Sequence, residues 1–195
     1  MSIFRELCNC ALIRELGREL NTDVLLFGFD GFTYFGTLQA IDDSRIAILS
    51  PAVEAETSNV EILSPGGELV EVKFARVDLW QIVAKGTGIV TDPIDPPRPP
   101  GPAVVLQEAS LGTTERQESC DLIRWLARQV GDDVAITTLG GFLFEGTLSE
   151  LDDCLAILSV DDIFVPGTSS SISSNNLRSV VINLNAITSV SGATS

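Results

Sequence analysis

Hydrophobic residues recur at helical spacing in two parts of the chain. Both sets repeat about every 3.6 residues, the spacing of one apolar helix face. The first set is Leu7, Leu12, Ile13, Leu16 and Leu20, and the second is Leu122, Ile123, Leu126 and Val130. The pattern predicts one amphipathic helix in each part.

After each predicted helix the pattern changes to short apolar runs separated by turn residues, as in β-strands. Asp30-Gly31 and Gly140-Gly141 separate the first two runs in each part and favour a tight primed hairpin turn. Asp42-Asp43 and Asp152-Asp153 form acidic turns before a third run. Two further runs follow, at 69–77 with 80–84 and at 178–184 with 186–190. We predict five strands in each part.

The two parts are copies of one unit, because residues 10–44 align with residues 120–154 without a gap. The matched positions include helix residues, turn residues and mid-strand glycines. They include Cys10 with Cys120, Leu12 with Leu122, Leu16 with Leu126, Asp23 with Asp133, Gly31 with Gly141, Gly36 with Gly146, and Asp42 with Asp152. Gly36 and Gly146 lie inside the second strand, where glycine permits a sharp bend.

A proline-rich segment divides the copies, since most of the nine prolines lie between Pro93 and Pro102. Proline fixes φ and removes a backbone donor, which makes such a segment a semi-rigid spacer. We expect a first repeat at 1–86, a linker at 87–114 and a second repeat at 115–195.

The repeat resembles the Sm-like fold, in which a helix precedes a small, strongly bent five-stranded barrel. The resemblance rests on one apolar strand residue, two glycines, a turn aspartate and a third-strand leucine in each copy. These are Val24, Gly31, Gly36, Asp42 and Leu49, and Val134, Gly141, Gly146, Asp152 and Leu158. It implies a mainly β chain with two tandem Sm-like (SH3-like) barrels. The ending Asn185 to Thr188 is also similar to bacterial Sm-like RNA chaperones.

The residues with which that family binds RNA are missing here. The resemblance implies an asparagine at the third strand, where this chain has Ile46, and an Arg-Gly pair before the last strand, which neither copy has. Leu184-Asn185 replaces the Lys-His pair of the bacterial form. No RNA pocket of the family's kind is retained.

Composition argues against catalysis and against nucleic acid. The chain has no His and its lysines are Lys73 and Lys85, which excludes His-dependent catalysis, His metal sites and a Gly-Lys-Ser/Thr phosphate loop. The net charge of -15 repels phosphate backbones and membrane surfaces. We predict no enzyme, no catalytic, metal-binding or cofactor-binding residues, and no cofactor.

The four cysteines lack the paired spacing of zinc or redox motifs. They are Cys8, Cys10, Cys120 and Cys154. We interpret them as small buried hydrophobic residues. No run reaches the roughly 20 apolar residues that span a bilayer, and the amino-terminal run carries Arg5 and Glu6. We expect a cytoplasmic protein with no membrane partner.

Three residue groups could form a site, and each has a structural alternative that we favour. Arg14, Arg18, Arg124 and Arg128 could bind phosphate or pair locally with glutamates. The acidic turns could bind a hard cation or simply cap their own backbone. The aromatic residues Trp80, Trp125, Phe27, Phe29, Phe32, Tyr34 and Phe35 could stack bases or pack in the core. Residues 51–68 and 167–176 are expected to form loops.

The predicted fourth and fifth strands are short and apolar, which makes them poor edges toward water. Pairing within one chain covers the junction between its copies and leaves one free edge at each end. The hypothesis is a non-catalytic assembly module that self-associates through its barrel edge strands into a homo-oligomer. A ring of three chains is one such arrangement. The candidate edge residues are Val72, Phe74, Ile82, Val180, Ile182 and Ile187. RNA binding through another surface is the alternative, disfavoured by charge, and an enzyme built on acidic residues is a third.

Overall fold

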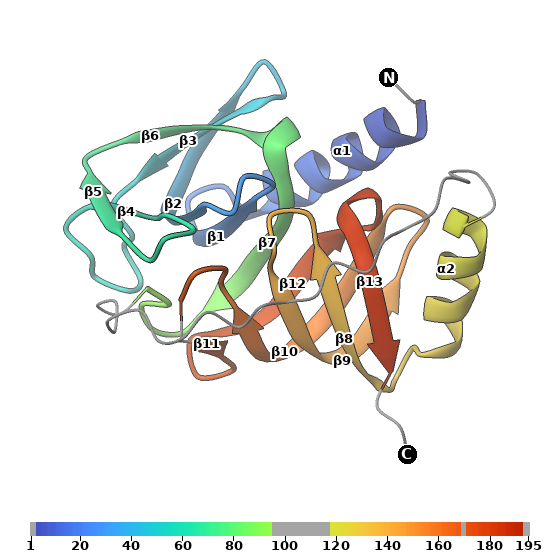
Figure 1. Ribbon diagram of the computed structural model, residues 1–195. Coiled ribbons are helices and arrows are strands. Elements are labelled where there is room, and N and C mark those ends of the chain that lie inside the picture. Colours follow the sequence, from blue (N-terminus) through green and yellow to red (C-terminus); the bar gives the residue numbers. More distant parts are fainter. Residues whose placement is uncertain (1–2, 95–117, 169–170, 193–195) are drawn as a thin grey trace.

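The computed structural model describes residues 3–94, 118–168 and 171–192, and Figure 1 shows their arrangement. Each repeat begins with the helix that its apolar pattern predicted. The helices are α1 (Ile3–Leu16), followed by the 3-10 turn η1 (Gly17–Glu19), and α2 (Glu118–Arg128). Leu16 and Leu126 are fully buried, whereas Leu20 and Val130 lie beyond the α-helices and are exposed.

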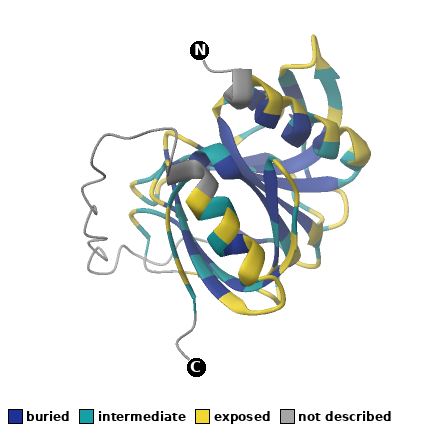
Figure 2. Cartoon of the chain, turned by 90° about the vertical axis from the view of Figure 1, so that its right-hand side faces the viewer, coloured by how far each residue is buried: buried dark blue, intermediate teal, exposed yellow. Residues whose placement is uncertain are grey.

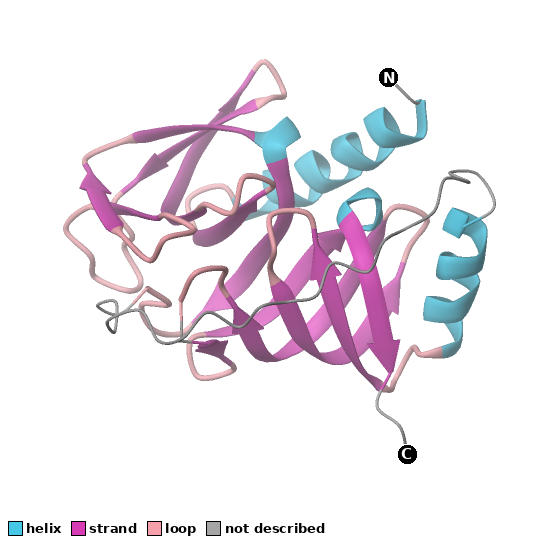
Figure 3. Ribbon diagram, in the orientation of Figure 1, coloured by secondary structure: helices cyan, strands magenta, loops and turns pink. Residues whose placement is uncertain are grey.

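The rest of the described chain is mainly β-strand (Figure 3). The first repeat contributes β1 (Asp23–Gly28), β2 (Thr33–Asp42), β3 (Ile46–Ser50), β4 (Val60–Leu63), β5 (Leu69–Val72), β6 (Ala75–Asp78), the 3-10 turn η2 (Leu79–Gln81) and β7 (Ile82–Ile89). The second contributes β8 (Asp133–Thr138), β9 (Leu143–Leu151), β10 (Leu155–Phe164), β11 (Ser171–Ser173), β12 (Leu177–Asn183), the 3-10 turn η3 (Leu184–Ala186) and β13 (Ile187–Gly192).

All described strands belong to one open antiparallel sheet with the order β13-β8-β9-β10-β12-β7-β1-β2-β3-β6. Strands β4, β5 and β11 lie off this path: β4 pairs with β2 and β5, and β11 pairs with β10. The two repeats therefore meet inside a continuous sheet, where β7 of the first pairs with β12 of the second.

The first hairpin has the same strand register in both repeats. Asp23 pairs with Thr37 as Asp133 pairs with Thr147. Equivalent bulges interrupt β7 against β1 and β13 against β8, at Phe27/Gly28 and at Ile187/Ser189 respectively. Both repeats have a helix, a first hairpin, a 3-10 turn before the last strand and the same closing strand pairs. The prediction of five strands in each was wrong, because the described residues form seven strands in the first repeat and six in the second.

The mid-strand glycines mark close approaches between strands. A Cβ at Gly36 would lie 2.5 Å from the Ser50 carbonyl oxygen, and one at Gly146 would lie even closer to the Ser159 carbonyl oxygen. Gly36 also marks the change of partner along β2, whose residues 33–35 pair with β4 and whose residues 37–42 pair with β3. A side chain at either position would push the strands apart. Glycine therefore permits the close approach, in agreement with the bend predicted from the sequence.

Several local predictions were wrong. Residues 69–77 form two strands, β5 and β6, with a break at Lys73 and Phe74, rather than one. Residues 51–68 include strand β4, and residues 167–176 include strand β11. Strand β7 continues to Ile89, three residues into the expected linker, whose residues 95–114 lie outside the described residues. The β1–β2 connection has four residues, Phe29–Phe32, instead of a two-residue primed turn.

The acidic turns and turn glycines lie where the alignment placed them. Gly31 and Gly141 have positive φ in the first hairpin connection of each repeat. Asp42 ends β2, and Asp152 follows β9, where its carboxylate accepts a hydrogen bond from the Asp153 amide. The backbone-capping interpretation of the acidic turn is confirmed there.

Candidate assembly interface

The junction between the repeats is a strand pair. Five residues of β12 lie opposite five of β7, and one of these pairs is Val181 with Lys85. Val180 and Ile182 are fully buried, and Ile82 is 3% exposed. The sequence offered these three residues as oligomer edges, but the structure places them inside the sheet of one chain.

Helix α1 crosses this junction and binds the second repeat covalently. Cys8 on α1 forms a disulfide with Cys154, which lies just before β10, 146 residues further along the chain. The interpretation of these two cysteines as simple hydrophobic residues was wrong. Cys10 is a free and exposed thiol, so the prediction that it is buried was also wrong. The Cys120 side chain lies outside the described residues.

A buried amide pair lies beside the disulfide. The Nδ2 of Asn183, at the end of β12, donates a hydrogen bond of 3.0 Å to the Oδ1 of Asn9 on α1. Both side chains are nearly inaccessible, at 2% and 4% exposed. A buried amide is costly unless it is paired, so this contact favours one seating of α1 on the second repeat.

Lys85 is the one buried cation among the described residues, with 2% exposure. Its Nζ donates to the backbone oxygen of Glu15 and to Oε1 of Glu19, at 3.2 Å each, where α1 passes into η1. Burial lowers the pKa of Lys85, and the nearby Glu19 carboxylate partly offsets this. Lys85 thus joins β7, one of the two junction strands, to the end of α1.

An aromatic cluster fills the core on the opposite side of the junction from α1. The Phe27 ring from the first repeat packs edge-on against Phe142 and Phe144 from the second, with centroid distances of 5.1 and 5.2 Å. All three are fully buried in a cluster that contains residues of both repeats. The core-packing interpretation of Phe27 is confirmed, and the two repeats share one core. Figure 2 shows the buried strands lying beneath the exposed outer face of α2.

The two ends of the sheet are strands β6 and β13, each paired on one side within the part of the chain that the structure describes. Strand β6 pairs with β3, and strand β13 pairs with β8. They occupy the same positions in their repeats as the strands that form the junction. β6 corresponds to β12, and β13 corresponds to β7.

The remaining predicted edge residues lie near these ends. Ile187 is on β13 and is half-buried. Val72 is the last residue of β5, and Phe74, 71% exposed, lies in the break between β5 and β6. The strands that pair with each other inside the chain, β7 and β12, contain Ile82, Val180 and Ile182. Ile187 instead lies on the end strand β13.

The outward face of β6 carries charged side chains. Arg45 makes a two-pronged contact with Asp78 at 3.0 and 2.6 Å, and its guanidinium lies 5.7 Å from the Trp80 ring centroid. Arg45 holds the pKa of the Asp78 carboxyl below its usual value, chiefly through the hydrogen bond. Arg76 is 69% exposed and lies 3.5 Å from Asp42.

The helix arginines show local ion pairs, as expected. Arg18 pairs with Glu15 at 2.7 Å, and Arg124 lies 3.8 Å from Asp121. Among residues 3–94, 118–168 and 171–192 there is no group of three or more acidic or cysteine side chains that could hold a metal. No described helix is long and apolar enough to cross a membrane.

Asp23 is a structural residue that sequence reasoning missed. Its buried carboxylate accepts hydrogen bonds from the Thr37 hydroxyl and from the backbone amides of residues 53, 54 and 55. These contacts hold the 51–57 loop against β1. In the second repeat the equivalent Asp133 is exposed, and its carboxylate accepts the corresponding hydrogen bond from the Thr147 hydroxyl. The unequal loop lengths after the third strand were the available signal.

Comparison with known proteins adds no relative: no protein-family model matches this chain, and no curated protein matches it. Its function must therefore be argued from the geometry of its own residues.

Proposed function

We propose that this chain is a non-catalytic, Sm-like assembly module that joins further copies of itself edge to edge, with β13 of one chain pairing with β6 of the next. The observation that carries the proposal is the β7–β12 pair inside the chain. This pair has the same geometry as the proposed contact, because β7 corresponds to β13 and β12 corresponds to β6.

The register supports a second copy as the partner of each free edge. Asp78 lies opposite Ile46 as Asn183 lies opposite Leu155, so β6 is held in the same alignment as β12. The bulge that shapes β7 recurs in β13. An edge and its complement are thus present on every chain, which is the requirement for head-to-tail association.

Unpaired edges are also a liability that proteins cover or blunt. Strand β13 has no charged residue over Ile187–Gly192, and Ile187 and Val190 are half-buried on it. Head-to-tail pairing would cover it. By analogy with bacterial Sm-like proteins, three chains would supply the six repeats of a closed ring.

Strand β6 offers a test that separates backbone pairing from side-chain effects. The Leu79 amide donates to the Arg45 carbonyl oxygen toward β3, so the strand alternation directs the Val77 amide to β3 and the Arg76 amide outward. Arg76→Pro removes an outward donor without removing a β3 hydrogen bond. Arg76→Ala loses the same guanidinium but keeps the donor.

We expect wild-type protein to have a mass of at least two chains, each of 20.8 kDa, by light scattering at micromolar concentration. Arg76→Pro should weaken association at least about tenfold more than Arg76→Ala, because a proline cannot donate to an added strand. A single-chain mass for the wild type at every concentration would instead mean that Arg76 simply blunts a solvent-facing edge.

A further inference from the structure

The inner junction and the outward surfaces differ in charge at equivalent positions. On α1, Ala11 follows Cys8 by one turn, so it shares the helix face that is bonded to Cys154 in the second repeat. Ala11 is 8% exposed and belongs to the apolar cluster that also includes Val181. The residue at the Ala11 position in α2 is Asp121, whose side chain is 71% exposed. An acid therefore stands where the inner junction has a buried methyl group.

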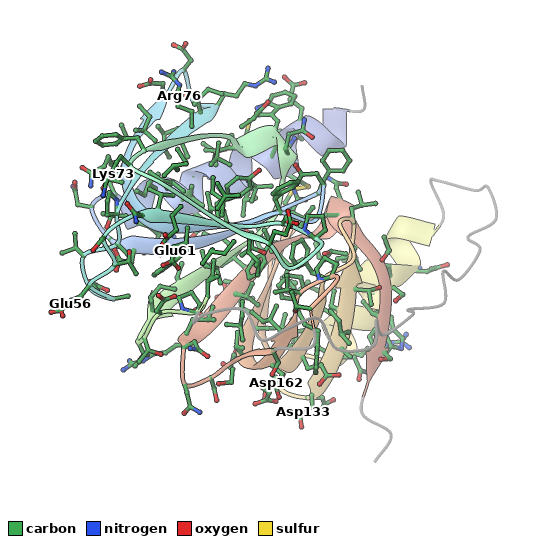
Figure 4. All side chains as sticks on the ribbon, turned by 60° about the vertical axis from the view of Figure 1, so that its left-hand side comes forward. Glu56, Glu61, Lys73, Arg76, Asp133 and Asp162 are labelled. Carbon is green, nitrogen blue, oxygen red and sulfur yellow. A yellow bond between two sulfur atoms is a disulfide. The ribbon has the colours of Figure 1, made fainter. Side chains whose placement is uncertain are left out.

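Strand β6 carries a positive charge at the position that corresponds to Val181 of β12. Val181 is opposite Lys85, and cross-strand neighbours project to the same side of a sheet. Lys85 reaches the end of α1, so Val181 also faces α1. Its counterpart in β6 is Arg76, because Arg76 lies opposite Ile48 as Val181 lies opposite Ile157. Figure 4 shows Arg76 at the margin of the molecule, directed outward.

The cation lies on β7 in the inner junction, as Lys85, and on β6 at the outward surface, as Arg76. In the inner junction Lys85 on β7 lies opposite Val181 on β12. Val190 on β13 takes the position of Lys85, since it lies opposite Ile136 as Lys85 lies opposite Leu26. A β13–β6 pair in the same register would place Val190 opposite Arg76. One cation and one valine would again meet, with Arg76 directed toward α2 of the neighbouring chain.

We propose that Asp121 on α2 of one chain pairs with Arg76 on β6 of the next. This inference rests on the proposed self-association and specifies its chemistry. The contact between chains is ionic and reversible at these positions, whereas the contact within a chain has a buried alanine and valine there and is closed by a disulfide. The partner is a second copy of this chain in one orientation, since an α2–α2 or β6–β6 contact would bring like charges together.

Both side chains can change partners at small cost. Arg76 is 3.5 Å from Asp42, and the two side chains are 69% and 48% exposed. Asp121 is 3.8 Å from Arg124, which is 77% exposed. Exposed pairs of this kind are weak because water and salt screen them. The contact between chains would partly exclude water and so strengthen the new pair.

The covalent bond has no counterpart on the outward surfaces. Cys8 corresponds to Glu118 in the alignment, and Cys154 corresponds to Arg45 in the strand register, because Leu155 and Ile46 hold the same position. No equivalent disulfide can therefore join one chain to the next. Of the positions compared, the two that hold cysteines lie where the chain's own two repeats meet. The sequence thus makes one junction permanent under oxidising conditions and leaves the other open to exchange.

A charge exchange tests the proposal. We expect Asp121→Arg and Arg76→Glu each to weaken association at least about tenfold, measured by sedimentation equilibrium at low salt, because each places like charges together. The double variant Asp121→Arg/Arg76→Glu restores opposite charges and should return to within about threefold of wild type. Raising the salt concentration should weaken wild-type association.

Glu54→Arg is the matched control, because it changes net charge as Asp121→Arg does but lies in the 51–57 loop. Glu56 of that loop is far from Arg76 in Figure 4. This variant should associate at least as well as wild type. If wild type associates and neither single reversal weakens it, the ionic pair is wrong while self-association stands. If wild type never associates, the proposed function and this inference both fail.

Discussion

Removing the disulfide is expected to lower the free energy of unfolding by about 2–5 kcal/mol, the usual cost of losing a native bridge. The bond joins Cys8 to Cys154 across 146 residues, so its loss releases a very long loop in the unfolded chain. The variant is Cys154→Ser, measured by chemical denaturation without reductant. Reductant should lower the stability of wild type toward that of the variant.

Cys10→Ser is the matched control, since Cys10 is exposed and outside the bridge. It should change stability by no more than about 0.5 kcal/mol. Equal stabilities for Cys10→Ser and Cys154→Ser would mean that the bridge does not hold α1 on the second repeat in solution.

Truncating Phe27 is expected to destabilise the protein by about 3–5 kcal/mol, the range for a large aromatic residue in a packed core. Phe27 is fully buried and contacts Phe142 and Phe144 edge-on, so its removal leaves a cavity shared by both repeats. Phe29→Ala is the control, because Phe29 is 48% exposed. Its effect should be clearly smaller.

The shared cavity should also make both repeats respond together. Each repeat holds one of the two tryptophans, Trp80 and Trp125, so Trp80→Phe and Trp125→Phe variants report the unfolding of one repeat each. The two fluorescence transitions should coincide, and Phe27→Ala should shift both to lower denaturant. Separate transitions would contradict a common core.

Local patterns in the sequence predicted much of each repeat. Leu12 and Leu16 are spaced for one helix face and are buried there. The gapless alignment predicted equal element order, because residues such as Gly36 and Gly146 meet the same steric requirement in both copies. The clustered turn residues located the strand ends. These features depend on neighbours in the chain, so they can be read from spacing alone.

Long-range pairing could not be read in the same way. Both fourth strands looked apolar, and chain connectivity does not say which one finds a partner inside the chain. The useful signal was the difference between Arg76 and Val181 at equivalent positions, since a charge suits an edge and a valine suits an interior. The Cys8–Cys154 bond lacked any local spacing motif. Its only trace was that the first copy has no cysteine at the position of Cys154.

Hydrogen exchange at the Arg76 amide is the most direct test of the pairing between chains. That amide points away from β3, so it is solvent-facing in a single chain and hydrogen-bonded if β13 of another chain pairs with β6. The amide of Val181 holds the equivalent place in the inner junction and serves as the internal reference. We predict that Arg76 exchange slows by about 100-fold or more as concentration rises through the association range, while Val181 stays protected throughout. An Arg76 amide that exchanges equally fast in the single chain and in a higher-mass assembly would contradict pairing through β6.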